Sequence, residues 1–452
     1  MSLKNKIISV KAEKIVFPGR SLCRCEDGIA LFTEGLLPQE TADVLVIKDK
    51  KTFREGLLKQ ITLKSPERTE PLCPSFGKCG GCTFQNTDYA NQIKYKKEYI
   101  NELLSVFGVE IGDILQSPEV WNYRNKMEFS FFNNDGLADL GLHCRGSFNR
   151  YSSVPPCYIA DEDFLKAATI IKDFANKNGL SAYNNRTHEG FFRHLVLRKA
   201  KNNGQMLINI VTNALEGSHA FFEPLIKDLG VFAQSIYWTQ NGRLSDAVIS
   251  DKLTLLLGKE NITEKLNVGG KDFHFNISPF SFFQTNSKGT EILYNEVLRQ
   301  LNPSKDDILL DLYCGTGTIG ICMAQKVKKI IGIEQVESAI ENAKTNASVN
   351  NVENAEFSAS TAEKWVKENS MVFDAIVVDP PRAGLTNDVI KFLLESEAKK
   401  IVYVSCNPST LARDLALIID SGKYKIKEIV PVDMFPQTYH IETVVSMTAL
   451  NF

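Results

Sequence analysis

The stretch ILLDLYCGTGTIG, residues 308–320, decides the fold of this chain. An apolar run containing Asp311 is followed at once by Gly315, Gly317 and Gly320. Glycines at such a point let the backbone turn sharply and approach a ligand, and the start of the next helix offers free amide donors. The stretch therefore predicts a strand, a ligand-facing loop and a helix, which together form one unit of an α/β sheet.

The residues around this unit continue the same alternation from about residue 285 onward. Strands that alternate with helices indicate a parallel sheet with helices on both faces and with ligand sites at the carboxyl ends of its strands. The C-terminal part is therefore predicted to be a Rossmann-like α/β domain. Its expected central strands are residues 308–314, 329–334, 355–360, 374–380 and 400–406.

Length and composition predict further domains before this one. A chain of 452 residues with 43% hydrophobic content is long enough for two to four domains. Residues 1–66 read as short strands broken by turns, which predicts a small OB-like β-barrel. Residues 67–270 mix strands and helices and predict an α+β central domain, which leaves 271–452 for the Rossmann-like domain. A basic cluster in the barrel is either a solvated hairpin or a contact surface for an RNA backbone; it comprises Lys48, Lys50, Lys51, Arg54 and Lys59.

Charge and hydropathy narrow the class of protein. The net charge of −2 gives no global electrostatic argument for nucleic-acid binding, so any such binding depends on local patches. The sequence begins without a signal-peptide pattern, and no apolar run approaches the roughly 18 to 20 residues that cross a bilayer. We therefore expect a cytoplasmic protein without a membrane partner, and nothing predicts an obligate protein partner.

The glycine-rich loop predicts a nucleotide-type cofactor. The next strand ends at Glu334, 19 residues after Gly315. A carboxylate at this point can accept hydrogen bonds from both ribose hydroxyls of an adenosine. Folds that bind NAD and folds that bind S-adenosylmethionine share these features, so the loop alone leaves both open.

The motif DPPRAG, residues 379–384, follows another expected strand. Its two prolines stiffen the loop at the strand end, beside the expected cleft. An Asp-Pro-Pro at this place is similar to methyltransferases that act on nucleobases. Members acting on exocyclic amines usually carry an aromatic residue next, whereas Arg382 follows here. A stiff loop without a ligand role is the alternative interpretation.

Nine of the ten cysteines divide into two groups, and Cys406 stands apart from both. In a chain without a secretory signal they argue against a disulfide framework. Four of them suggest a metal site, because Cys73, Cys79 and Cys82 follow C-x5-C-x2-C and Cys157 follows in VPPC. Four thiolates can ligate zinc or a [4Fe-4S] cluster, and the spacing favours the cluster because zinc ribbons usually show two C-x2-C pairs. Small buried hydrophobic residues are expected at Cys23, Cys25, Cys144, Cys314 and Cys322.

Several segments taken together resemble one family. They are CPSFGKCGGCTF, PPC, SPFSFFQTN, LDLYCGTGTIG, IGIE, DPPRAG, YVSCNPSTLARDL and FPQTYHIE, between residues 73 and 442. This set resembles the S-adenosylmethionine-dependent RNA 5-methyluridine methyltransferases, specifically the 23S ribosomal RNA type with a TRAM domain and a [4Fe-4S] cluster. The N-terminal strands resemble the TRAM barrel. Transfer RNA is the alternative substrate, and a non-catalytic, cluster-bearing RNA-binding protein is the alternative from another class.

The resemblance implies that Cys406 is the nucleophile and Glu442 the general base. Carbon 5 of uracil is a poor nucleophile, but addition of a thiolate at carbon 6 turns the ring into an enolate whose carbon 5 attacks a methyl donor. The carbon 5 proton must then be removed by a base so that the cysteine can be eliminated. The target uridine is expected to leave its RNA stack first. The other interpretation of Cys406 is a small hydrophobe at the end of a core strand.

The remaining implied roles concern substrate and cofactor. The positions implied for substrate binding are Gln284, Asp379 and Phe282. Those implied for S-adenosylmethionine are Gln284, Tyr313, Gly315, Gly317, Thr318, Glu334, Thr361 and Asp379. Relatives often carry an acidic residue where this chain has Thr361, so the adenine contact departs from their pattern. The ligands implied for the [4Fe-4S] cluster are Cys73, Cys79, Cys82 and Cys157.

Overall fold

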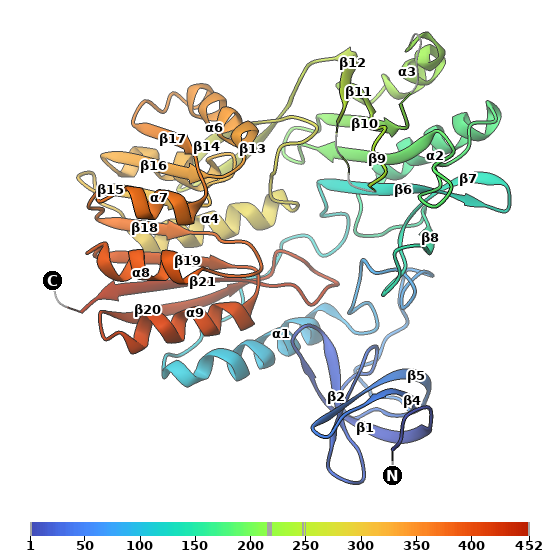
Figure 1. Ribbon diagram of the computed structural model, residues 1–452, viewed down its shortest axis with the longest axis horizontal. Helices are drawn as coiled ribbons and strands as arrows, with labels where there is room; N and C mark the ends of the chain where they lie inside the picture. Colours follow the sequence, from blue (N-terminus) through green and yellow to red (C-terminus); the bar gives the residue numbers. More distant parts are fainter. Residues whose placement is uncertain (1, 215–218, 246–247, 249, 451–452) are drawn as a thin grey trace.

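The computed structural model describes residues 2–214, 219–245, 248 and 250–450. The chain forms three bodies that each centre on a sheet: an N-terminal barrel, a central sheet and a C-terminal sheet with helices on both faces (Figure 1). Residues 1 and 451–452, at the outer ends of the predicted domains, lie outside the described residues. Within the described part of the chain, no helix is both long enough and apolar enough to cross a membrane.

The N-terminal barrel is closed, with the strand order β1-β2-β3-β5-β4, as the short alternating strands predict. Val10, Ala12 and Val44 point inward and are almost fully buried. Arg54 does not belong to a free basic surface: it is 3% exposed, and its guanidinium bonds Asp27 and Asp49. The strands are β1 (Ile7–Val16), β2 (Arg20–Arg24), β3 (Ala30–Thr33), β4 (Thr41–Asp49) and β5 (Phe53–Leu63).

The central sheet has seven strands in the order β12-β11-β10-β9-β6-β7-β8. Its core packs Phe164 of α2 and Phe222 against Trp238, which is 2% exposed. The strands are β6 (Lys126–Asn134), β7 (Leu137–His143), β8 (Tyr151–Ser153), β9 (Phe192–Lys199), β10 (Met206–Thr212), β11 (Ser235–Gln240) and β12 (Lys252–Gly258). The helices are α2 (Glu162–Lys177), η2 (His219–Phe222) and α3 (Glu223–Leu229).

The C-terminal sheet has the order β17-β16-β15-β18-β19-β21-β20. Its first five strands are parallel, as predicted, whereas β21 runs antiparallel to both β19 and β20. The chain leaves β15 in one direction toward β16 and in the other toward β18, and ligands bind where the strand order reverses in this way. The strands are β15 (Ile308–Leu312), β16 (Lys329–Glu334), β17 (Ala355–Ala359), β18 (Ala375–Val378), β19 (Lys400–Ser405), β20 (Tyr424–Val432) and β21 (Glu442–Ala449).

Two separate apolar layers cover the faces of this sheet. Leu309 packs in one layer and Leu310 in the other, because successive side chains of a strand point to opposite faces. Helices α4, α5 and α6 cover the first face, together with the hairpin of β13 (Ile262–Val268) and β14 (Lys271–Ile277). Helices α7, α8 and α9 cover the second. Their bounds are α4 (Ser287–Leu301), α5 (Thr318–Met323), η3 (Ala324–Lys326), α6 (Glu337–Val349), α7 (Ala362–Glu368), α8 (Asn387–Glu395) and α9 (Pro408–Asp420).

Helix α1 (Tyr89–Leu104), which is followed by the short turn η1 (Ser105–Phe107), packs on this second layer. Its Tyr99 and Leu104 share an apolar cluster with Leu411 of α9 (Figure 1). The segment that joins the barrel to the central sheet thus lies on the C-terminal body. The division at residues 66 and 270 stays a prediction.

Candidate active site

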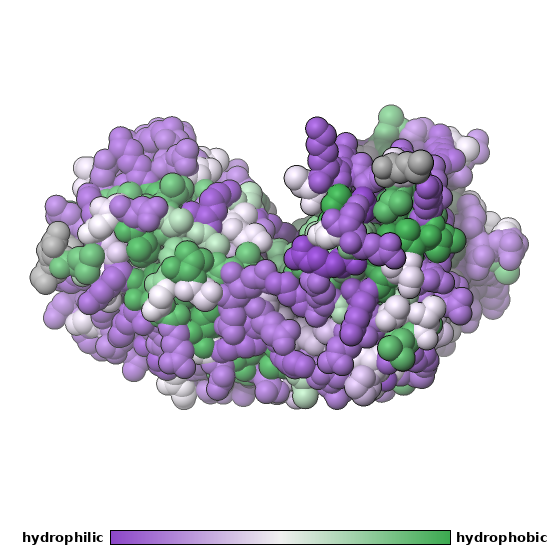
Figure 2. Space-filling view, turned by 90° about the horizontal axis from the view of Figure 1, so that it is seen from below, coloured by the Kyte–Doolittle hydropathy of each residue, from purple (hydrophilic) through white to green (hydrophobic). Residues whose placement is uncertain are grey.

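A cavity of about 850 Å³ opens at the carboxyl ends of β15, β16, β18 and β19. Its volume falls within the range of small-molecule sites. The surface is hollowed between the two lobes of the molecule (Figure 2). Nine of the predicted site residues line the cavity: Phe282, Gln284, Tyr313, Gly315, Thr318, Glu334, Asp379, Cys406 and Glu442.

The loop after β15 takes the sharp turn that its glycines predict. Tyr313, Gly315 and Gly317 all have positive φ, of 65°, 55° and 75°. A Cβ atom on Gly317 would meet Ala343 and the ring of Phe357 at 3.0 Å, so only glycine fits there. Gly317 therefore shapes the loop without lining the cavity.

Asp311 secures this loop from below. Its Oδ2 accepts a hydrogen bond of 2.9 Å from the amide of Gly320 in α5. Burial, together with the nearby charges of Asp379 and Glu334, raises the pKa of the Asp311 carboxyl to about 7. Asp311 therefore links β15 to the start of α5.

Glu334 ends β16 at one wall of the cavity. Its Oε2 accepts from the amide of Gly315 at 3.3 Å, and its Oε1 accepts from the amide of Val336 at 2.9 Å. Each carboxylate oxygen keeps further acceptor capacity, which suits a pair of ribose hydroxyls. Thr361 is placed differently. Its hydroxyl caps α7 by accepting from the amide of Lys364, and its side chain does not line the cavity although Ser360 beside it does.

Cys406 and Glu442 lie together at another part of the cavity. Cys406 directly follows β19 and Glu442 opens β21, and these two strands are paired. Asn407 starts α9 beside the thiol by accepting from the amide of Ser409 at 3.1 Å. The strand-to-helix turn therefore holds Cys406 at the sheet edge, half-buried and facing the cavity. The interpretation of Cys406 as a core hydrophobe does not account for this placement.

The thiol and both carboxyls at this end have raised pKa values. Burial, together with the charges of Glu442 and Asp379, raises the pKa of Cys406 to about 12. Burial likewise raises the pKa of Glu442 to about 8 and that of Asp379 to about 7. The charge of Arg382, in the motif DPPRAG, lowers the pKa of both Cys406 and Glu442 and so opposes part of these shifts.

His440 lines the same end of the cavity. Burial lowers its pKa to about 3, and Arg382 and Lys96 contribute. His440 is therefore a neutral imidazole at pH 7, whereas the carboxyls of Asp379 and Glu442 titrate near neutrality.

The two phenylalanines of SPFSFFQTN have different surroundings. Phe283 is 6% exposed and packs in the core, while Phe282 is 64% exposed and lines the cavity. Phe282 therefore has a free face for stacking. Gln284 lines the cavity as well, and its carbonyl accepts from the amide group of Asn125 at 2.9 Å.

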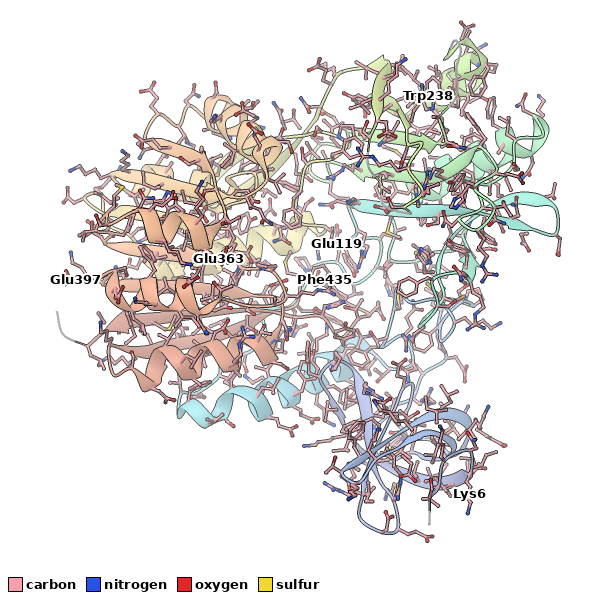
Figure 3. The ribbon with its side chains drawn as sticks, in the orientation of Figure 1. Lys6, Glu119, Trp238, Glu363, Glu397 and Phe435 are labelled. Atoms are coloured by element: carbon pink, nitrogen blue, oxygen red, sulfur yellow. The ribbon has the colours of Figure 1, made fainter. Side chains whose placement is uncertain are left out.

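Sequence reasoning assigned no site role to several residues that line the cavity, among them Tyr294, Arg124, Phe435 and Glu363. Tyr294 of α4 bonds the hydroxyl of Thr318 at 2.8 Å, and Arg124 reaches the cavity from the central body. Phe435 comes from the loop between β20 and β21 and is labelled in Figure 3, as is Glu363 of α7, which also lines the cavity. Phe435 belongs to the segment FPQTYHIE that the sequence had singled out, whereas Tyr294 carried no signal apart from helical spacing.

The four predicted ligand cysteines line one small cavity of about 20 Å³ beside β7. Burial is the main cause that raises the pKa of Cys82 to about 12 and that of Cys157 to about 11. The neighbouring thiols contribute to both shifts. Among the residues the structure describes, no three His, Cys, Asp or Glu side chains are grouped so as to hold a metal ion. The expectation for Cys144 was wrong: it is half-exposed and forms a β-bridge with Cys79, because the strand that bears it continues beside the cysteine loop.

Comparison with known proteins identifies the class. A family described as tRNA (Uracil-5-)-methyltransferase matches residues 244–450. An RNA methyltransferase of Caldanaerobacter subterraneus subsp. tengcongensis, described as uncharacterized, is 42% identical over 98% of both chains. Another, from Clostridium acetobutylicum, is 38% identical over 98% of this chain and 97% of that one.

A solved structure is similar over the same extent. The Pyrococcus abyssi tRNA (uracil-54, C5)-methyltransferase, in complex with S-adenosyl-L-homocysteine, has a TM-score of 0.77 and 30% identity, covering 98% of this chain and all of that one. Fold and cavity thus define a Rossmann-like methyltransferase. More particularly, the chain belongs to the RNA (uracil-5-)-methyltransferase family, and it is an RNA-modifying enzyme.

Proposed function

We propose that this enzyme transfers a methyl group from S-adenosylmethionine to carbon 5 of a uridine in 23S ribosomal RNA, through a covalent bond between Cys406 and carbon 6. One observation carries the proposal. A single cavity brings Cys406 and Glu442 together with Glu334 and the loop at Gly315. A thiol, a titrating carboxyl and a nucleoside-binding wall are what this reaction requires.

The cofactor lies along the wall formed by the ends of β15 and β16. Glu334 accepts the ribose hydroxyls, and the backbone at Gly315 allows close approach. Tyr313 and Thr318 contact the cofactor from the same loop and helix. Gln284 and Asp379 lie where cofactor and base meet, and an amide with a carboxyl can distinguish the donor at uracil N3 from the acceptor of cytosine. Phe282 stacks on a base. An adenine contact at Thr361 uses the backbone, because its hydroxyl already caps α7.

Catalysis proceeds in three steps. The Sγ of Cys406 releases its proton to solvent and, as the thiolate, bonds to carbon 6. The electrons of the double bond between carbons 5 and 6 move to form the enolate, which makes carbon 5 nucleophilic. Carbon 5 then bonds to the methyl group, and S-adenosylhomocysteine leaves. Glu442 finally takes the carbon 5 proton, the electrons restore the double bond between carbons 5 and 6, and the carbon–sulfur bond breaks to return the thiolate. A base with a pKa near 8 is matched to proton transfer at neutral pH.

The proposed cluster site is formed by Cys73, Cys79, Cys82 and Cys157. Its support is the donor set, since four half-buried or buried thiols line one cavity. A [4Fe-4S] cluster there would join the loop at Cys79 to Cys157 near the central sheet, and it takes no part in the methyl transfer. Tetrahedral zinc remains the alternative group.

Transfer RNA is the second candidate substrate. The Pyrococcus abyssi enzyme, similar over nearly the whole chain, methylates uracil 54 of tRNA. We place 23S ribosomal RNA first because the cysteine set resembles that type of the family. The N-terminal barrel, which resembles a TRAM domain and is proposed to hold RNA, does not separate the two substrates, because the Pyrococcus abyssi enzyme is similar over 98% of this chain.

The test is transfer of labelled methyl groups from S-adenosylmethionine to unmodified 23S ribosomal RNA or unmodified tRNA, followed by nucleoside analysis. Labelled 5-methyluridine in ribosomal RNA supports the proposal, and label in tRNA alone supports the second candidate. No labelled 5-methyluridine in either RNA contradicts both and leaves the non-catalytic RNA-binding protein. The Cys406→Ala variant is the background control in each reaction.

A further inference from the structure

The loop between β20 and β21, residues 433–441, joins several distant segments of the chain. It projects from the C-terminal sheet toward the centre of the molecule (Figure 1). Two of its side chains, Phe435 and His440, line the reaction cavity, and Glu442 follows it directly. The contacts that hold this loop therefore determine where its side chains line the cavity.

The segment that carries Cys82 holds the middle of the loop. The amides of Thr83 and Phe84 both donate to the carbonyl of Gln437, at 2.8 and 3.1 Å. The amide of Tyr439 in turn donates to the hydroxyl of Thr83 at 3.0 Å. Gln437 has a φ of 68°, which is uncommon for a residue other than glycine and needs support from its surroundings.

Helix α1 completes this support. Gln92 is 1% exposed; its amide nitrogen donates to Gln437 Oε1 at 3.0 Å, and its Oε1 accepts from the Gln437 amide at 2.9 Å. Gln92 also donates to the carbonyl of Phe84 at 3.2 Å, so one side chain spans the helix, the cysteine segment and the loop.

The same segment is bonded to the cysteine-lined cavity. Gln85 accepts from the amide of Cys73 at 3.0 Å, and its side chain bonds the thiol of Cys82. Cys82 is the immediate neighbour of Thr83. Continuous covalent and hydrogen-bonded contacts therefore run from Cys73 and Cys82 to Gln437 and Tyr439.

We infer that Thr83 and Gln437 are positioning residues that couple the cysteine-lined cavity to the reaction cavity. They do so by fixing the conformation of the loop at residues 433–441, which carries Phe435 and His440. The effect of this coupling on catalysis rests on the proposed function. Whatever group the four cysteines bind, its loss loosens the segment at Thr83 and so misplaces the loop before Glu442. The rate at which the carbon 5 proton is removed then falls by a larger factor than the affinity for RNA.

The test compares Thr83→Val with Thr83→Ser in the full chain. Valine matches threonine in shape but cannot accept the Tyr439 amide proton, whereas serine can. The part-buried Tyr439 amide, left without its acceptor, is costly enough to shift the loop. We expect kcat to fall about tenfold with KM for RNA within about twofold. The fraction of enzyme trapped on RNA should rise, and the serine variant should match the wild type. Unchanged kcat and trapped fraction in Thr83→Val would overturn the inference.

Hydrogen exchange separates this inference from the proposed function, because it needs no substrate. Cys73→Ser, at the far end of the cysteine segment, should speed exchange of the amides at Gln437 and Tyr439 at least threefold. Cys322→Ser, in α5, serves as the control and should not. Equal exchange in Cys73→Ser and the wild type contradicts the coupling even if the enzyme methylates RNA. Faster exchange supports it even if no 5-methyluridine forms.

Discussion

Cys406 and Glu442 stand on adjacent strands: Ser405, which precedes the cysteine, is the register partner of Thr443, which follows the glutamate. The two side chains are 36 positions apart in sequence, yet the antiparallel pairing of β19 with β21 brings both to the cavity. In the proposed mechanism, this pairing sets the nucleophile and the base beside the same uracil ring.

Replacing Cys406 with alanine should abolish methylation while cofactor binding stays near that of the wild type. The thiol provides the covalent step, whereas the wall at Glu334 does not involve it. Methyl transfer to RNA and calorimetric titration with S-adenosylmethionine measure the two effects. Cys322→Ala, which removes another thiol of the same domain, should retain activity. Appreciable turnover by Cys406→Ala would refute the covalent mechanism.

Replacing Glu334 with glutamine should weaken S-adenosylmethionine binding by about tenfold, because an amide bonds two ribose hydroxyls and the Gly315 amide less well than a carboxylate. Titration calorimetry measures the change. The exposed Glu337, the first residue of α6, provides the matched control as Glu337→Gln. Equal affinity of Glu334→Gln and wild type would show that the ribose is bound elsewhere.

Stability should fall as pH rises from about 5 to 8. Asp311, Asp379 and Glu442 keep their protons in the folded state, with pKa values of about 7, 7 and 8, and lose them near pH 4 when unfolded. Between these values the folded protein binds more protons than the unfolded chain, so raising the pH favours unfolding. Thermal unfolding against pH measures the slope. Glu442→Gln should flatten it between pH 5 and 8, and an unchanged slope would contradict the raised pKa of Glu442.

Lys96 of α1 and Asp433 form a fully buried ion pair at 2.7 Å, with both side chains 0% exposed. Burial alone would lower the pKa of Lys96, and the Asp433 carboxylate opposes that shift. Lys96→Met leaves Asp433 without its cation and should cost about 3 to 5 kcal/mol of stability. Lys94→Met, on the exposed side of the same helix, should cost less than about 1 kcal/mol. Denaturant unfolding compares the two, and equal losses would contradict a role for the buried pair.

Local sequence signals predicted most of the fold and the composition of the cavity. The glycines after β15 and the alternating strands indicated a Rossmann-like sheet because both signals depend on neighbours in sequence. The placement of α1 was not predictable, because its contact with α9 joins residues about 300 positions apart. Likewise, the burial of Lys96 and Arg54 depends on acidic partners that only the tertiary structure brings near.

The most direct test of the covalent mechanism uses Glu442→Gln. This variant keeps the thiol of Cys406 but lacks the base, so it should methylate carbon 5 and then stop before elimination. After incubation with S-adenosylmethionine and RNA, denaturing gels should show a slow-migrating adduct, and mass spectrometry should find 5-methyluridine bound to the peptide that contains Cys406. Full release of 5-methyluridine without an adduct, or an adduct on another residue, would contradict the mechanism.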